Sequence, residues 1–165
     1  MGYNLTIGEA KIYYDPEYLV VGLTAENVTH PDAPDHDSFV GKSNKRMPSY
    51  VGWRDFCRDA GIEPLFYGEG WGPEMRRRKP CQEGFHRETP LLNEHPGTEP
   101  ICKGDFDYIR EARIRREKTN GGKQPGFESD DLDDTLARLL WLEFWMGWAL
   151  ENCKIPVFHN SRVFI

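Results

Sequence analysis

SDDLDDTLARLLWLEFWMGWALENC, residues 129–153, is the stretch that decides the fold. Ser129 is a favourable N-cap, and the aspartates that follow it place negative charge where the N-terminus of a helix attracts it. Residues 139–150 are almost all apolar, so no single stripe of a helix would bury them. A helix that is apolar on every side is surrounded by its own protein. The stretch therefore predicts a buried helix over residues 130–152, against which the rest of the chain packs.

The predicted helix carries three tryptophans and two charged side chains. Its main packing contributions come from Trp141, Trp145 and Trp148. Arg138 and Glu143 interrupt the apolar run, which is shorter than the roughly 20 residues of a membrane span. A buried carboxylate is costly unless it is paired. Glu143 is therefore either a functional acid or one half of a structural salt bridge to a loop arginine, and the salt bridge is the favoured interpretation.

Alternating patterns at the two ends of the chain predict a small antiparallel sheet. Residues 3–10 alternate apolar and polar side chains, residues 11–14 extend the pattern, and residues 18–25 supply a second strand that pairs with the first. A last short strand is expected at residues 155–159. With the apolar helix, this predicts one α+β domain over residues 1–165, with long ordered loops, those of residues 72–104 covering one edge.

Two further helices are predicted. The first covers residues 50–60, between Ser49 as N-cap and Gly61 as the terminating glycine, and it has one apolar face made by Trp53, Phe56, Cys57 and Ala60. The second covers residues 105–118 and has few apolar positions, which indicates a surface helix. The polar, glycine-rich residues 119–126 after it are expected to be a mobile connector.

Composition limits the classes of function. The net charge is −6, and basic residues gather in the middle of the chain, a pattern that argues against general nucleic-acid binding but allows a local anion site. Four cysteines are widely spaced and follow no signal peptide, so free thiols and a cytoplasmic location are expected. The chain has no P-loop, nucleophile elbow, kinase or H-E-x-x-H pattern, which favours a binding protein over an enzyme.

The strongest candidate site is an anion-binding loop that leads into the first helix. Residues 42–50, KSNKRMPSY, offer cationic, amide and hydroxyl donors just before a helix N-terminus. Aromatic side chains beside them would stack on a nucleotide base. The turn at residues 95–97 is expected to close the site. Trp53 also belongs to the predicted core face, so its ring is available to a ligand only if it is not fully buried. The predicted ligand-binding residues are Asn44, Arg46, Ser49, Tyr50, Trp53 and His95.

Two weaker clusters contain metal-ligating residue types. The first lies within eight residues and comprises His30, Asp32, Asp35, His36 and Asp37. The second has residue types that suit zinc and comprises Cys81, His86, His95 and Cys102. Neither has the close ligand spacing of a defined metal motif, so turn-forming carboxylates, hydrogen-bonded histidines and buried thiols are the competing interpretation. A metal-dependent hydrolase or nuclease is the alternative function that these clusters suggest.

Several segments resemble small proteins of phages that infect actinobacteria and of related prophages. They are MGYNLTIGEA, THPDAP, SNKRMPSYVGWRDFCRDAGI, NEHPG and TLARLLWLEFWMGWALENCKIP, and residues 68–92 do not share the resemblance. The resemblance implies phage origin and no particular chemistry. The expected function is that of a phage accessory protein, with counter-defence as one role, which binds a small anionic, nucleotide-like ligand or a host protein. A virion or assembly component is a further alternative.

Overall fold

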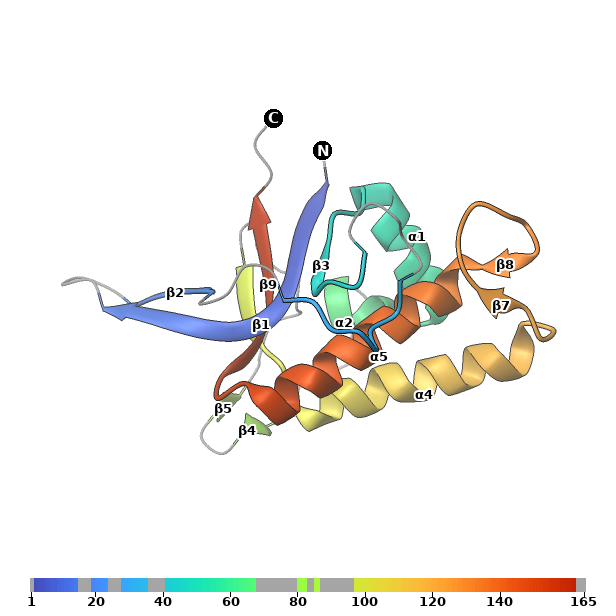
Figure 1. Ribbon diagram of the computed structural model, residues 1–165. Coiled ribbons are helices and arrows are strands. Elements are labelled where there is room, and N and C mark those ends of the chain that lie inside the picture. Colours follow the sequence, from blue (N-terminus) through green and yellow to red (C-terminus); the bar gives the residue numbers. More distant parts are fainter. Residues whose placement is uncertain are drawn as a thin grey trace.

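Two strands from opposite ends of the chain pair at the centre of a sheet (Figure 1). The β1 strand (Tyr3–Tyr14) runs antiparallel to β9 (Pro156–Arg162), with Tyr3 opposite Arg162 and Glu9 opposite Pro156. The molecule is represented by a computed structural model that describes residues 2–14, 19–23, 28–35, 41–67, 80–82, 85–86 and 97–162. Helices and an antiparallel sheet make this an α+β fold, as the sequence predicts.

The remaining strands of the sheet flank this central pair. The β2 strand (Leu19–Leu23) is antiparallel to the second half of β1, which confirms the predicted pairing. On the other side, β6 (Gly97–Pro100) pairs with β9, giving the order β2-β1-β9-β6. The short β3 strand (Lys45–Arg46) pairs with the first half of β1. Two segments that are irregular by composition therefore contribute strands, because partner strands supply the hydrogen bonds that fix them.

The helix predicted from residues 129–153 is α5 (Asp134–Asn152), and it begins later than expected. Its N-cap is Asp133, whose Oδ1 accepts a hydrogen bond from the Leu136 N–H at 3.0 Å. Ser129 instead accepts from the Asp131 N–H in a preceding turn. The prediction of Ser129 as N-cap is wrong because β8 (Leu132–Asp133) pairs in parallel with β7 (Gln124–Pro125), which holds the chain extended until Asp133.

The same pairing corrects the expectation of a mobile connector. Residues 119–126 leave the preceding helix through Gly121 and Gly122, whose φ values of 70° and 77° favour glycine. The segment then enters β7. The Asn120 side chain accepts from the Gly122 N–H and donates to the Lys123 carbonyl, so the turn is internally hydrogen-bonded.

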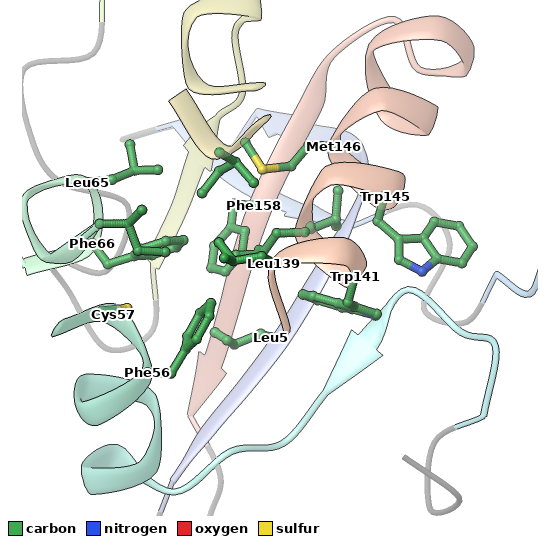
Figure 2. Packing of buried hydrophobic residues seen from close by; sticks show 14 of the residues in the cluster. Leu5, Phe56, Cys57, Leu65, Phe66, Leu139, Trp141, Trp145, Met146 and Phe158 are labelled. Carbon is green, nitrogen blue, oxygen red and sulfur yellow. The ribbon is translucent and has the colours of Figure 1, made fainter. Parts of the chain in front are cut away.

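The core forms where α5 packs across the sheet and α1 (Figure 2). Its largest fully buried side chains on α5 are Trp141 and Trp145, whereas Trp148 is only half-buried at the edge of the cluster. Leu5 and Phe158 reach it from β1 and β9, and the α2 helix (Glu63–Tyr67) adds Phe66. Burial of α5 is therefore confirmed for the face that meets the sheet and α1, whereas Leu140, Phe144 and Trp148 are only partly buried. Among the described residues, no helix is long and apolar enough to cross a membrane.

The α1 helix (Tyr50–Ala60) has the predicted ends and the predicted buried face. The Ser49 hydroxyl accepts from the Gly52 N–H at 3.0 Å, and Gly61 follows the helix with a φ of 71°, in the left-handed region. Trp53, Phe56, Cys57 and Ala60 are all buried.

The α4 helix (Lys103–Thr119) lies alongside α5 (Figure 1) and is more than a surface helix. It begins two residues before the predicted start because buried Asp105 accepts a hydrogen bond from the Cys102 N–H at 3.0 Å, closing its N-terminus. Ile109 and Ala112 are fully enclosed. The prediction that this helix is superficial is therefore wrong for one of its faces, which packs against its neighbours.

Glu143 forms the salt bridge that was the favoured interpretation. Its two carboxylate oxygens accept hydrogen bonds from Nε and Nη2 of Arg113 at 2.7 and 2.8 Å. This bidentate geometry raises the pKa of the Arg113 guanidinium, chiefly through the hydrogen bonds to Glu143. The arginine comes from α4 and not from a loop, so the pair fixes two helices against each other.

Candidate functional site

Asn44, the first residue of the predicted ligand set, is committed to the backbone. Its side chain is fully buried, Nδ2 donates to the Ile7 carbonyl at 2.7 Å, and Oδ1 accepts from the Val28 N–H at 2.9 Å. The carboxamide therefore joins β1 to the chain at residue 28 and holds the segment that leads into β3. This arrangement makes Asn44 a structural support of the site and leaves its side chain no free face for a ligand.

Replacing Asn44 with alanine is expected to lower the free energy of unfolding by about 2–3 kcal/mol, because one buried and one partly buried backbone group lose their partners. Urea unfolding followed by tryptophan fluorescence would measure the change. Ser49→Ala, which removes an exposed cap, is the matched comparison and should cost about 1 kcal/mol. An Asn44 variant as stable as the Ser49 variant would contradict this role.

The aromatic wall predicted from Tyr50 and Trp53 is only partly available. Trp53 is 1% exposed and packs against Phe56 and Phe66 in the core. Tyr50 is half-buried, with its ring edge-on to Tyr3 at a centroid distance of 4.6 Å. A purine base therefore has no flat, open aromatic surface at these two residues. His95 lies outside the described residues, so its predicted approach to Arg46 stays a prediction.

Arg46 and Trp53 do meet at a small cavity between β3, α1 and α5. Its volume is about 80 Å³. We call it the arginine cavity, and its described lining residues are Arg46, Met47, Pro48, Trp53, Phe127, Arg138 and Trp141.

Arg46 is held against an indole that is itself fixed. The residue is 8% exposed, and its guanidinium carbon lies 5.5 Å from the centre of the Trp141 ring, within the range of a cation–π contact. Trp141 donates from Nε1 to the Ser43 carbonyl at 2.9 Å. Since Ser43 lies just before β3, the hydrogen bond ties α5 to the segment that carries Arg46. The strand pairing of Arg46 with Leu5 fixes its backbone as well.

Arg138 brings a second positive charge from α5. Its guanidinium carbon lies 4.9 Å from the Phe127 ring centre and 5.9 Å from that of Phe56. One turn earlier on α5, Asp134 forms an ion pair with it at 3.2 Å, but Asp134 does not line the cavity. The aromatic contacts orient the guanidinium, and the cavity therefore has cationic side chains from two different elements.

One residue of the lining also carries a buried hydrogen-bond donor. The Trp53 indole N–H is enclosed and has no hydrogen-bond partner among the described residues. A buried donor without a partner costs free energy. Of the described lining residues, two are arginines and none carries a carboxylate, a thiol or an imidazole. This set of side chains suits binding of an anion and supplies no nucleophile or general base.

The predicted metal clusters are only partly within the described residues. His30 Nδ1 accepts a hydrogen bond from the Asp32 N–H at 3.0 Å, as the turn interpretation expects. The Cys102 thiol lies buried at the start of α4, where it donates to Asp105 at 3.1 Å. His36 and the side chains of Cys81 and His86 lie outside the described part. Within that part, no group of three or more His, Cys, Asp or Glu side chains is placed to hold a metal ion.

The sequence predicts only some of the residues that line the arginine cavity. Arg46 and Trp53 are in the predicted set, whereas Phe127, Arg138 and Trp141 are not. In the sequence, Arg138 is only an interruption of the apolar helix and Trp141 only a core residue. The sequence signal for this part of the cavity is the positive charge of Arg138. A cation next to an apolar helix face needs an aromatic or anionic neighbour.

Comparisons with known proteins add no relative. No family model, curated protein or solved structure matches the chain. The arginine cavity is therefore interpreted from its own side chains.

Proposed function

We propose that this protein is a binding protein whose arginine cavity holds an anionic group of a small ligand. The observation that supports the proposal most is the lining itself: Arg46 and Arg138, from two different elements, line one small cavity beside the rings of Trp53 and Trp141. Arginine binds carboxylate and phosphate through paired, charge-assisted hydrogen bonds. Low solvent access strengthens such bonds, because water competes less for the anion.

The cavity size limits what enters it. About 80 Å³ corresponds to between two and three water molecules at roughly 30 Å³ each, which is room for a carboxylate or a phosphate group. A nucleoside would have to remain outside. Met47 lines the cavity and is 48% exposed, so it offers an apolar contact to the part of a ligand that projects from the opening. The ligand class is therefore an organic phosphate or carboxylate that inserts its anionic end.

The resemblance to phage proteins gives this activity a setting. A small phage protein that sequesters an anionic metabolite or nucleotide signal of the host would act during infection, and counter-defence is the role that follows. Binding of a host protein is the other branch of the same proposal. No described residue of the cavity favours the hydrolase or the virion component.

Isothermal titration calorimetry with inorganic phosphate, acetate, and linear and cyclic mononucleotides tests the proposal. We expect at least one anion to bind and expect Arg46→Met to weaken it by about 10–100-fold, because a charge-assisted hydrogen bond contributes about 1.5–3 kcal/mol. Methionine keeps an unbranched chain over the Trp141 ring while it removes the charge. Arg138→Met should have a similar effect.

Arg58→Met is the matched control, because Arg58 is exposed on α1 and pairs at 3.8 Å with Glu63, away from the cavity. It should bind like the unchanged protein. All variants would first be compared by thermal melting. Absence of heat with every anion, or equal affinity of the Arg46, Arg138 and Arg58 variants, would refute the cavity as a binding site.

A further inference from the structure

A second concave surface runs along the outer side of α4 and α5. This groove has a volume of about 990 Å³ and is separate from the arginine cavity. We call it the helix groove. Its floor comes from α5, one wall from α4 and the other wall from residues 30–34.

The floor is a half-buried apolar stripe on α5. The stripe consists of residues three or four positions apart, which places them along one helix face. They are Leu140, Phe144, and the neighbouring Gly147 and Trp148. Gly147 allows α4 to pack closely against this face, since a Cβ there would lie 3.1 Å from Cε2 of Phe106 on α4. The exposed sides of these residues therefore form a grooved apolar surface above the core.

The wall opposite α4 is pinned in place. The His30 ring lies edge-on to Phe144 with a centroid distance of 5.3 Å. The Asp32 N–H donates to His30 Nδ1, and Lys42 Nζ donates to the Pro31 carbonyl at 2.6 Å. The groove is thus a built feature with two fixed sides, and it does not depend on a loose loop.

Charges inside the groove pair with one another. Arg113 bonds Glu143 in bidentate fashion and also approaches Glu117 at 3.3 Å, while Arg110 lies 3.8 Å from Glu143. Two arginines are therefore balanced by two glutamates. These pairs lie along the α4 wall and leave little net charge on it.

The rim keeps an excess of negative charge. Asp32 and Glu151 line the groove, are exposed, and form no ion pair with any described residue. Glu151 stands in the last turn of α5, which has no basic residue to offset the negative end of the helix dipole. An occupant that matches this groove has apolar side chains for the floor and positive charge for the rim.

We propose that the helix groove docks a basic amphipathic helix of a partner protein. The floor extends from Leu140 to Glu151, about 16 Å at 1.5 Å per residue, which matches three turns of a helix. Helices bind such grooves through apolar anchors at i, i+3 or i+4, and i+7. Lysine or arginine beside that stripe would meet Asp32 and Glu151, and this charge complementarity selects a basic partner over an acidic one.

Selection from a random library of displayed 16-residue peptides on the purified full chain tests this proposal. We expect enriched peptides to carry an apolar helical stripe with flanking lysine or arginine. Their affinity, measured by fluorescence anisotropy of synthetic copies, should fall at least tenfold for the double variant Asp32→Lys with Glu151→Lys. Both positions are exposed, so the double variant should melt like the unchanged protein.

A control double variant has the same net charge as the first double variant but leaves the groove unchanged. Asp55→Lys with Asp131→Lys changes two exposed acids outside the groove lining and should bind the peptides with unchanged affinity. Enrichment of acidic or non-amphipathic peptides would overturn the proposal, as would no enrichment at all. Equal losses in the two double variants would also overturn it, because they would indicate general charge attraction. Since the arginine cavity does not enter this test, its outcome is independent of the proposed anion binding.

Discussion

Replacing Asp133 with alanine is expected to lower the free energy of unfolding by about 3–5 kcal/mol. The side chain is 1% exposed and joins three elements. Arg116 donates to both of its oxygens at 2.7 and 3.0 Å, Asn120 donates at 3.0 Å, and the Leu136 N–H completes the cap of α5. Alanine would remove the cap and leave the Arg116 charge facing a site built for a carboxylate.

The asparagine variant and the pH dependence separate these contributions. Asparagine is as good an N-cap as aspartate, so Asp133→Asn should lose mainly the charge interaction and be less damaging than alanine. Burial alone would raise the pKa of Asp133, but hydrogen bonds from Arg116, Asn120 and the backbone outweigh it, and the pKa is lowered. A lowered folded-state pKa contributes stability above the unfolded-state pKa near 4, and that stability is lost as the pH falls through the folded-state value.

Urea unfolding at several pH values between 7 and 2 would measure this. The unchanged protein should lose more stability on acidification than Asp133→Asn does, because the variant has no carboxylate to protonate at this position. Asp134→Ala, one residue later and exposed, should cost less than about 1 kcal/mol. Parallel pH profiles for the unchanged protein and Asp133→Asn would show that the network contributes no such stability.

Replacing Trp141 with alanine is expected to destabilise the protein by about 3–5 kcal/mol as well, for a different reason. The indole is 1% exposed and belongs to the core (Figure 2), and its removal would leave a large cavity. It would also remove the hydrogen bond to the Ser43 carbonyl and the ring under Arg46. The variant should therefore weaken both the fold and anion binding.

Two comparisons identify the source of that loss. Trp141→Phe keeps an aromatic ring but no N–H donor, so it should cost about 1–3 kcal/mol, mostly from the Ser43 carbonyl left without its partner. Trp148→Ala removes the same side chain at the half-buried edge of the core and should cost less than Trp141→Ala. Chemical unfolding of the three variants gives the order, and equal losses at positions 141 and 148 would contradict the difference in burial.

Local signals were sufficient where an element is defined by its own residues. The α1 helix was predicted at both ends because Ser49, Gly61 and the apolar face lie within thirteen consecutive positions. The start of α5 was not predicted correctly. Asp133 is extended and not helical because its strand pairs with Gln124–Pro125. The strand at Gly97–Pro100 has no alternation of its own and is a strand because β9 lies beside it.

The residues of the candidate site also divide into those that local sequence indicates and those that only the fold brings together. Arg46 and Trp53 lie close together in the sequence, in a loop and helix whose donors were recognisable. Arg138 and Trp141 are some ninety residues further along, and only the packing of α5 on β3 and α1 brings them to the same cavity. A single sequence carries no information on that distance, so the second arginine could be recognised as a cation but not as a partner of the first.

The central pairing of β1 with β9 sets the order in which entropy is lost during folding. Bringing Tyr3 to Arg162 closes nearly the whole chain, at about 4.5 kcal/mol for the length-dependent part of the closure entropy. The turn between α4 and α5 closes a loop of only fourteen residues, at about 2.3 kcal/mol by the same relation. We therefore expect the helical pair to form before the central strand pairing. The β1–β9 pairing is expected later, since Tyr3 and Arg162 must meet before its hydrogen bonds form.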